Sequence, residues 1–202
     1  MSKFILAIDQ GTTGSTASLI GQEGTSAGHV NQSFEQIYPR PGWVEHSPEA
    51  IWKSVTDVIQ SVLEKTGVSR GDIVGIGITN QRETAIVWDR QTGQPIHNAI
   101  VWQCRRTTPF CQDLKKSGKE KTLFKKTGLV VDPYFTGSKY KWILDKVKGA
   151  RKKASHGKLA AGTVDSFLLW KLTGGEEHKT DVSNASRTQL MNIEKGDWDN
   201  WL

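Results

Sequence analysis

Residues 3–20 read KFILAIDQGTTGSTASLI. The apolar run over residues 3–8 stops at Asp9, which is typical of a buried strand. Residues 10–14 form a turn rich in glycine and threonine, and residues 15–20 alternate weakly between apolar and polar side chains. This stretch therefore predicts a β-hairpin with a carboxylate at the end of its first strand.

The segments that follow extend the hairpin into a sheet with a crossover helix. Residues 28–34 predict a third strand and residues 72–79 a fourth. Between them, Ser47 is a good helix N-cap, Pro48 suits the first helical position, and Gly67 is a typical helix end. The order of these elements predicts the α/β class, with a mixed sheet flanked by helices. The predicted apolar face of the helix consists of Ile51, Trp52, Val55, Ile59, Val62 and Leu63.

The second half of the chain predicts two more strands and then mostly helices. Residues 84–88 and 96–102 look like strands, and the turn-rich segment 89–95 joins them. Helical patterns dominate from Thr107 onward. Residues 163–172 predict an amphipathic helix that two glycines stop.

The chain ends in the run DWDNWL, without a glycine, a proline or a polar tail. We expect the first domain to be incomplete at this end, with Trp198, Trp201 and Leu202 left exposed. Exposed apolar patches and open strand edges bind other chains, so we expect self-association.

The composition is that of an ordinary globular chain. Its 202 residues are 36% hydrophobic and 24% charged, and no apolar run approaches the ~20 residues that span a membrane. Cys104 and Cys111 show neither metal-site nor disulfide-framework spacing, which favours a reducing, cytoplasmic setting. The net charge of +6 allows nucleic-acid binding, but solvated helix faces explain it better because no RNA-binding motif accompanies the charge. The basic residues cluster at Lys115, Lys116, Lys119, Lys121, Lys125 and Lys126, and again at Lys146, Lys148, Arg151, Lys152 and Lys153.

An arginine and a glutamate stand side by side after the predicted fourth strand, in the run ITNQRET over residues 78–84. Neighbouring side chains of a strand point to opposite faces, so Arg82 and Glu83 can serve one ligand only if the chain bends there. Such a bend places five N–H donors beside two carboxylate oxygens. This set suits a small polyol, because each hydroxyl both donates and accepts. An ordinary solvated ion pair in a loop is the alternative.

Longer runs carry a resemblance to a known family. The chain resembles the glycerol kinases in the strings FEQIYPRPGWVEH (34–46), ITNQRETAIVWDRQTGQPIHNAIVWQCRRT (78–107), TGLVVDPY (127–134) and NASRT (184–188). The similarity extends roughly over residues 3–199. Relatives of the xylulokinase type are expected to carry a Met-His pair near the position of Arg82 and Glu83, and this chain does not.

The resemblance implies a ribonuclease-H-like domain of the actin-like ATPase fold. It also implies transfer of the γ-phosphoryl group of ATP to glycerol, giving glycerol 3-phosphate. Members of the family have two such domains, with the active site in the cleft between them. On this basis residues 1–202 are a truncated N-terminal, polyol-binding domain, and the second domain with its adenine pocket is absent. The family's catalytic base, an aspartate, is expected beyond residue 202.

The family's polyol site has matching residues in this chain. The resemblance implies that Arg82, Glu83 and Tyr134 hold glycerol, and that Trp102 is the aromatic wall against which its carbons pack. Glu83 accepts from a hydroxyl, Arg82 and Tyr134 donate, and Trp102 covers the C–H faces. Taken singly, Trp102 also fits a core tryptophan and Tyr134 an ordinary turn residue. The conjunction of all these matches favours the site.

The hairpin tip, DQGTTG, resembles the family's first phosphate loop. The hydroxyls of Thr12 and Thr13 and consecutive N–H groups can donate to the phosphate oxygens of ATP, and Asp9 can hold Mg²⁺ directly or through water. Gly14 and Thr16 complete the nucleotide-binding set that the resemblance implies, although the family often has serine and arginine at these positions. A hairpin turn without a ligand is the alternative.

Two other functions stay open on sequence grounds. One is a kinase for another small polyol or sugar on the same fold. The other is a non-catalytic binding or regulatory protein, a truncated paralogue with half a polyol site and no base. For the intact enzyme we expect glycerol and ATP or ADP as partners and a homo-oligomer, with no nucleic acid and no membrane span.

Overall fold

The computed structural model describes residues 3–202 of the chain. These residues divide into two compact units: residues 3–36 and 47–81 form unit 1, and residues 37–46 and 82–202 form unit 2. Each unit therefore draws on two separate segments of the sequence.

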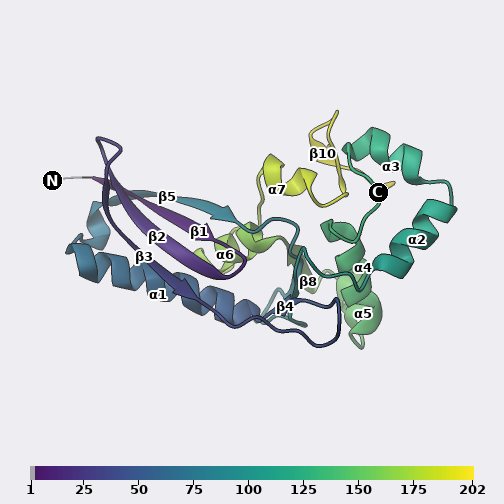
Figure 1. Ribbon diagram of the computed structural model, residues 1–202, viewed down its shortest axis with the longest axis horizontal. Coiled ribbons are helices and arrows are strands. Elements are labelled where there is room, and N and C mark those ends of the chain that lie inside the picture. The colour runs from purple at the N-terminus through teal and green to yellow at the C-terminus, as the bar shows by residue number, and fades with distance from the viewer. Residues whose placement is uncertain (1–2) are drawn as a thin grey trace. The chain divides into compact units, whose positions relative to one another are not determined.

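Unit 1 is built on a four-stranded mixed sheet (Figure 1). Its strands are β1 (Phe4–Gln10), β2 (Gly14–Gly21), β3 (Ser26–Ser33) and β5 (Ile73–Asn80). Their order is β3-β2-β1-β5. β1 is antiparallel to β2, with Phe4 opposite Gly21, and parallel to β5, with Asp9 beside Thr79. The predicted hairpin, the third strand and the fourth strand are confirmed.

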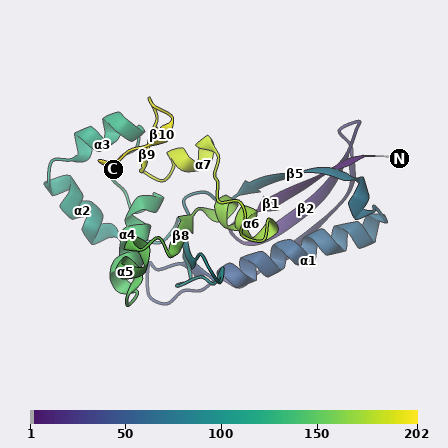
Figure 2. The ribbon, with the colours of Figure 1, turned by 180° about the vertical axis from the view of Figure 1, so that it is seen from behind.

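One long helix, α1 (Pro48–Thr66), lies along one face of this sheet (Figures 1 and 2). Both of its ends follow the predicted signals. The Ser47 hydroxyl accepts from the Ala50 N–H at 3.2 Å, and Gly67 caps the last turn in the left-handed conformation, with φ of 69°. Val58 is buried more deeply than the predicted Ile59. A short 3₁₀ helix, η1 (Arg70–Asp72), leads into β5.

β5 is an edge strand with an uncovered apolar surface. In the sheet order it pairs with β1 alone. Val74 is 62% exposed and Ile76 is 51% exposed, and Ile5 on the neighbouring strand is 50% exposed. A Cβ atom added at Gly75 or Gly77 would meet nothing within 4 Å. Unpaired backbone groups and exposed branched side chains together make a surface that binds other chains.

The strands described in unit 2 are short and pair two by two. They are β4 (Glu45–His46), β6 (Ile86–Asp89), β7 (Ala99–Ile100), β8 (Leu159–Gly162), β9 (Met191–Asn192) and β10 (Asp197–Trp198). The pairs are β4–β7, β6–β8 and β9–β10, all antiparallel. The strands predicted over 84–88 and 96–102 shorten to β6 and β7, and only isolated bridges join these two segments. β6 forms its ladder with β8, which the sequence analysis missed because the run LAAG has no β-branched or aromatic residue.

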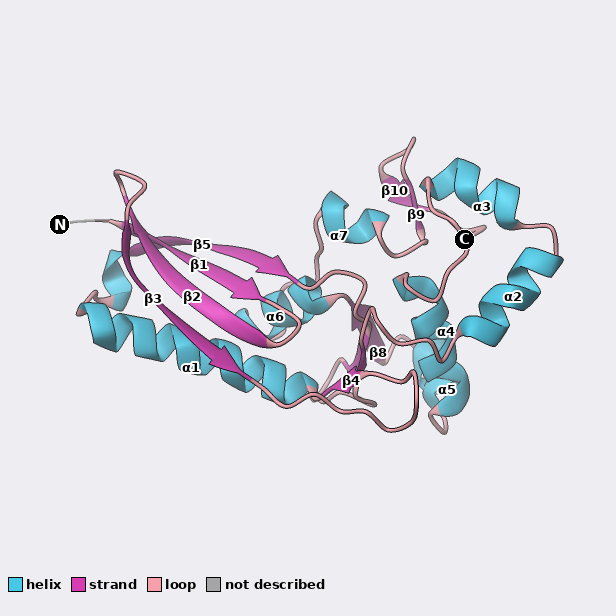
Figure 3. Cartoon of the chain, viewed as in Figure 1, coloured by secondary structure: helices cyan, strands magenta, loops and turns pink. Residues whose placement is uncertain are grey.

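Helices make up much of the rest of unit 2 (Figure 3), as predicted from Thr107 onward. They are α2 (Thr108–Lys116), α3 (Glu120–Thr127), α4 (Thr136–Lys146), α5 (Ala150–Ser155), α6 (Val164–Leu172) and α7 (Val182–Ser186). The prediction that α6 is amphipathic is wrong, because Val164, Asp165, Phe167 and Trp170 are buried and leave it no polar, solvated face. None of the helices over residues 3–202 is long and apolar enough to cross a membrane.

Aromatic rings form much of the core of unit 2. Trp88 is fully buried, and its ring centroid lies 5.4 Å from that of Phe167. In another cluster the Arg106 guanidinium lies 4.0 Å from the Trp43 ring and 4.7 Å from the Trp142 ring. Trp88 is therefore a core residue, whereas Trp43 and Trp142 are partly buried and pack against the core.

The end of the chain is partly packed. Trp198 and Trp201 are 55% and 46% exposed, as predicted. Leu202, however, packs against the buried cluster of Cys111, Leu123 and Val131. The prediction that Leu202 is exposed is therefore wrong, because the final turn brings it back onto α2 and α3.

A lysine on α4 is fully buried. Lys139 is 0% exposed, and its Nζ donates to the carbonyl oxygens of Tyr134 at 2.5 Å and Phe135 at 3.0 Å. The side chain thus ties the turn before α4 to the helix itself. Burial lowers the pKa of Lys139 to about 7.

We expect the chain to self-associate through β5. Val74→Lys and Ile76→Lys should each weaken association by roughly tenfold, or about 1.4 kcal/mol, because a charge on an edge strand opposes pairing with a second strand. Sedimentation velocity over a concentration series measures this. Val182→Lys is the matched control, since Val182 is 68% exposed in unit 2. A wild-type chain that stays monomeric at high concentration would contradict the expectation.

We also expect stability to rise with pH above neutrality because of Lys139. Its pKa is about 7 in the folded chain and about 10.4 when unfolded. Between these values the unfolded state binds more protons, so the free energy of unfolding increases by up to about 1.4 kcal/mol per pH unit. Urea unfolding of wild type and Lys139→Met at pH 7 and pH 9 isolates this contribution. Parallel pH profiles for the two proteins would refute it.

Candidate functional site

The bend predicted at Arg82 and Glu83 is present in the structure. β5 ends at Asn80, and Glu83 adopts the left-handed backbone conformation with φ of 61°. The two side chains part at this bend: Arg82 is exposed, whereas Glu83 is only 3% exposed. A non-glycine residue in this conformation costs about 1–2 kcal/mol, so the contacts of Glu83 have to hold it there.

The main contact of Glu83 comes from Arg187, at the C-terminal end of α7. Arg187 Nε donates to Glu83 Oε1 at 2.5 Å. The same guanidinium lies 5.7 Å from the Tyr134 ring and 4.9 Å from the Phe135 ring. A single arginine therefore contacts both the carboxylate and the aromatic segment of the predicted polyol site.

The aromatic members of the predicted site lie next to each other. The ring centroids of Trp102 and Tyr134 are 5.5 Å apart, with an angle of 58° between their planes. Tyr134 is fixed by a turn in which its N–H donates to Asp132 Oδ1 at 2.8 Å. Trp102 follows a short strand, and its N–H donates to the Thr84 hydroxyl at 3.4 Å. Both rings are therefore positioned by backbone segments of unit 2.

The structure thus brings Glu83, Trp102 and Tyr134 together through Arg187, all within unit 2. Arg82 adjoins them in sequence but is exposed, and no hydrogen bond to it is found over residues 3–202. Such an arrangement offers carboxylate acceptors, a phenolic hydroxyl, an exposed guanidinium and an aromatic surface. This is chemistry for a small polyhydroxy ligand.

Sequence reasoning missed two residues of this region, Arg187 and Lys139. The string NASRT contained Arg187, but nothing in its spacing linked it to Glu83, because the two are 104 residues apart. Nothing in the sequence distinguished Lys139 from the exposed lysines Lys141 and Lys146 that follow it in the same helix. Only the fold shows that both cations are directed at the Tyr134 turn.

The predicted phosphate loop is the tip of the β1–β2 hairpin in unit 1. The Gly11 N–H donates to the Gly14 carbonyl at 2.8 Å and closes the turn. Thr13 is exposed and Thr12 is partly exposed. Asp9 is exposed one residue before the end of β1. The hairpin therefore presents two hydroxyls and one carboxylate near its tip.

The positions that depart from the family pattern have structural partners in β3. A Cβ atom at Gly14 would lie only 2.6 Å from the Gln32 carbonyl oxygen, so a serine there requires the strands to shift. The Thr16 hydroxyl accepts from Asn31 Nδ2 at 2.8 Å. Gly14 and Thr16 thus serve the sheet, and their part in nucleotide binding stays a prediction.

Asp9 is the residue predicted to hold a metal. Over the described residues, no group of three or more His, Cys, Asp or Glu side chains is placed to bind an ion. Mg²⁺ in nucleotide sites is usually held by one or two carboxylates together with phosphates and waters. A lone exposed carboxylate fits that pattern, in which the nucleotide supplies most of the ligands.

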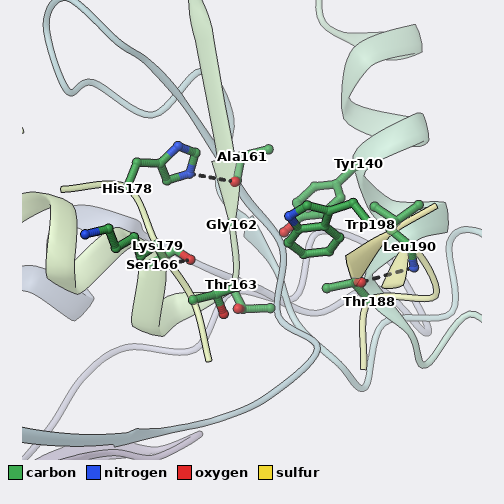
Figure 4. Close-up of a pocket in the computed structure, with 11 residues that line it drawn as sticks. Tyr140, Ala161, Gly162, Thr163, Ser166, His178, Lys179, Thr188, Leu190 and Trp198 are labelled. Carbon is green, nitrogen blue, oxygen red and sulfur yellow. Dashed lines mark hydrogen bonds between the residues drawn. The ribbon is translucent and has the colours of Figure 1, made fainter. Parts of the chain in front are cut away.

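A cavity of about 580 Å³ in unit 2 is a second candidate site (Figure 4). The rings of Tyr140 and Trp198 lie on one side of it, and Ser166 of α6 and His178 of the following loop lie on the other. His178 Nε2 donates to a backbone carbonyl at 3.0 Å, and Ser166 Oγ donates to another at 2.8 Å. None of the described side-chain atoms that are buried without a partner lines this cavity. The site around Glu83 is the stronger candidate because the predicted Glu83, Trp102 and Tyr134 meet there.

Relatives of known family match almost the whole chain. Residues 4–202 match the N-terminal domain of the FGGY family of carbohydrate kinases. The glycerol kinases of Alkaliphilus metalliredigens and Caldanaerobacter subterraneus subsp. tengcongensis are 58% and 56% identical over 199 residues, which is 98% of this chain. Each match covers 40% of the relative, so the chain spans about 40% of the length of these curated relatives.

Solved structures agree with this result. The Plasmodium falciparum glycerol kinase with ADP superposes with a TM-score of 0.92 at 33% identity, covering 99% of this chain and 40% of that one. A gluconate kinase from Lactobacillus acidophilus gives a TM-score of 0.86 at 23% identity over 100% of this chain and 39% of that one, a likeness of fold alone. The predicted actin-like fold and the family resemblance are confirmed. The chain belongs to the FGGY family of carbohydrate kinases, and residues 4–202 match its N-terminal domain.

Proposed function

We propose that the intact protein transfers the γ-phosphoryl group of ATP to glycerol, giving glycerol 3-phosphate. The observation that carries this proposal is the grouping of Glu83, Trp102 and Tyr134 around Arg187 in unit 2. Support comes from relatives at 55–58% identity, which are named glycerol kinases, and from a similar solved kinase that holds ADP.

Each residue of the polyol site has one role in this proposal. Glu83 accepts from a glycerol hydroxyl, while Arg82 and Tyr134 donate to hydroxyl oxygens. Trp102 covers the C–H faces of the three-carbon chain. The exposure of Arg82 supports its role, because a guanidinium with no hydrogen bond to the protein over residues 3–202 is available to a ligand.

The hairpin tip of unit 1 takes the phosphates of ATP in this proposal. Thr12 and Thr13 donate to phosphate oxygens together with backbone N–H groups of the turn, and Gly14 and Thr16 complete the nucleotide-binding set. Asp9 holds Mg²⁺ directly or through water. The bound ion supplies positive charge that offsets the charge developing on the transferred group.

The remaining parts of the enzyme lie outside residues 1–202 in this proposal. A second domain binds the adenine, and an aspartate in the remainder of the chain takes the proton from the attacking hydroxyl. We place the intact enzyme in the cytoplasm as a homo-oligomer. The cytoplasmic assignment is supported by Cys104 and Cys111, which are both buried and free.

A coupled assay of ADP release by the intact protein tests the proposal. We expect release that depends on glycerol, with xylulose and gluconate as poor substrates. Preferential turnover of either sugar compound would favour the rival assignment to another kinase of the same fold. Glycerol binding without any turnover would favour a non-catalytic protein.

We expect residues 1–202 alone to produce no ADP in a glycerol-dependent way. The chain supplies the polyol residues and one phosphate loop, and a kinase gains much of its acceleration from holding both substrates in place. The same coupled assay on purified residues 1–202 checks this. Glycerol-dependent ADP release would show that the base lies within this chain.

We expect Arg82→Ala and Glu83→Ala each to lower kcat/KM for glycerol in the intact protein. Each leaves a ligand hydroxyl without its partner, at about 1–3 kcal/mol, or roughly 5- to 150-fold. Glu83→Ala should also lower the melting temperature, because Arg187 loses its carboxylate, whereas Arg82→Ala should not. Arg151→Ala, at an exposed arginine paired with Asp145, is the control. Wild-type kinetics in either variant would remove that residue from the polyol site.

A further inference from the structure

Arg187 reaches the polyol site from a segment 104 residues after Glu83. We propose that Arg187 is a positioning residue of this site: it holds one oxygen of Glu83, so that the other is presented to a substrate hydroxyl, and it seats the ring of Tyr134. The inference rests on the proposed function and adds a residue to it.

The contact with Glu83 uses one carboxylate oxygen. Arg187 Nε lies 2.5 Å from Glu83 Oε1, and a charge-assisted bond of this kind fixes the orientation of the carboxylate. Over residues 3–202 no hydrogen bond to Glu83 Oε2 is found. A carboxylate has about four lone-pair sites, so Oε2 keeps its capacity to accept from a hydroxyl while Oε1 is held.

The same guanidinium lies over the aromatic segment. Its centre lies 5.7 Å from the Tyr134 ring and 4.9 Å from the Phe135 ring, within the range of cation–π attraction. Arginine combines a fixed hydrogen-bonding edge with a stacking face, and lysine does not. The residue type is therefore matched to both contacts at once.

The backbone around Arg187 is fixed from both sides. Asp181 caps α7 by accepting from the N–H groups of Ser183 at 2.6 Å and Asn184 at 3.0 Å. On the other side, the Thr188 carbonyl accepts from the Gly137 N–H at 2.7 Å. Gly137 is two residues after Phe135, so the segment that carries Arg187 is joined directly to the turn that carries Tyr134.

Backbone strain is concentrated beside this pair. Over residues 3–202, Glu83 and Gln189 are the non-glycine residues with positive φ, at 61° and 64°. Glu83 is the partner of Arg187, and Gln189 follows Arg187 by two positions. Strained residues of this kind persist where surrounding contacts hold them, and they gather at functional sites.

A purely structural ion pair makes a different prediction from a positioning residue. Removing Arg187 leaves a buried carboxylate without compensation, and this lowers stability in either case. Only a positioning role changes which hydroxyls the site distinguishes. The decisive measurement is therefore substrate discrimination in a folded variant.

The experiment compares Arg187→Met and Arg187→Lys with wild type in the intact protein. Steady-state kinetics are measured with glycerol, propane-1,2-diol and propane-1,3-diol. For Arg187→Met we expect the KM for glycerol to rise about 10- to 100-fold, with the KM for ATP within about twofold. The preference for glycerol over at least one diol should fall by about tenfold or more. That diol lacks the hydroxyl that donates a hydrogen bond to Glu83 in glycerol. Arg187→Lys should recover part of the glycerol KM.

Melting curves and a matched variant separate folding from positioning. Arg151→Met removes an exposed arginine from its ion pair with Asp145 and should leave kinetics unchanged. If Arg187→Met does not fold, Arg187→Lys keeps the charge and decides the question. A folded Arg187→Lys with wild-type KM and wild-type discrimination would then overturn the inference.

The two proposals fail in different ways. A wild-type protein that does not use glycerol refutes the proposed function before any variant is made. A wild-type protein that uses glycerol, with a folded Arg187→Met that keeps its KM and its preference over both diols, refutes the inference alone.

Discussion

A carboxylate that is buried on a left-handed turn persists only where a cation compensates its charge. Glu83 is such a residue, and Arg187 Nε lies 2.5 Å from it. The pair joins the bend after β5 to the end of α7, and the guanidinium extends the connection to the Tyr134 ring. Lys139 holds the same turn by donating to the carbonyl oxygens of Tyr134 and Phe135. The geometry of the predicted polyol site therefore depends on two basic side chains that do not belong to the predicted ligand set.

The hairpin of unit 1 meets a different constraint. In the proposed function its tip stays open to a ligand while its strands stay closely paired. Gly14 lets β3 approach so closely that a Cβ atom at this position would clash with it. The Thr16 hydroxyl accepts a hydrogen bond from Asn31 of β3. Gly14 and Thr16, which depart from the family's phosphate-binding pattern, thus stabilise the pairing of the strands. In the proposed function, phosphate binding by the hairpin rests on the turn's hydroxyls and backbone N–H groups, and Asp9 acts through Mg²⁺.

Tryptophans divide between core and site according to their neighbours. Trp88 is fully buried against Phe167 and contributes to the core of unit 2. Trp102 is partly exposed and faces Tyr134 instead. The two residues have the same chemistry and lie only a short distance apart in sequence. The difference in burial therefore makes Trp88 a packing residue and leaves Trp102 as a candidate ligand-binding surface.

The sequence by itself determined the elements whose signals are local. The β1–β2 hairpin, α1 with its caps at Ser47 and Gly67, and the bend before Glu83 depend on residues within a few positions of one another. The family strings also pointed to Glu83, Trp102 and Tyr134. Tertiary structure alone decided the pairing of β6 with β8, the burial of α6 and Leu202, and the partnership of Arg187 with Glu83. These join segments roughly 70 to 104 residues apart, and no local propensity carries information about which distant segment completes a strand or neutralises a charge.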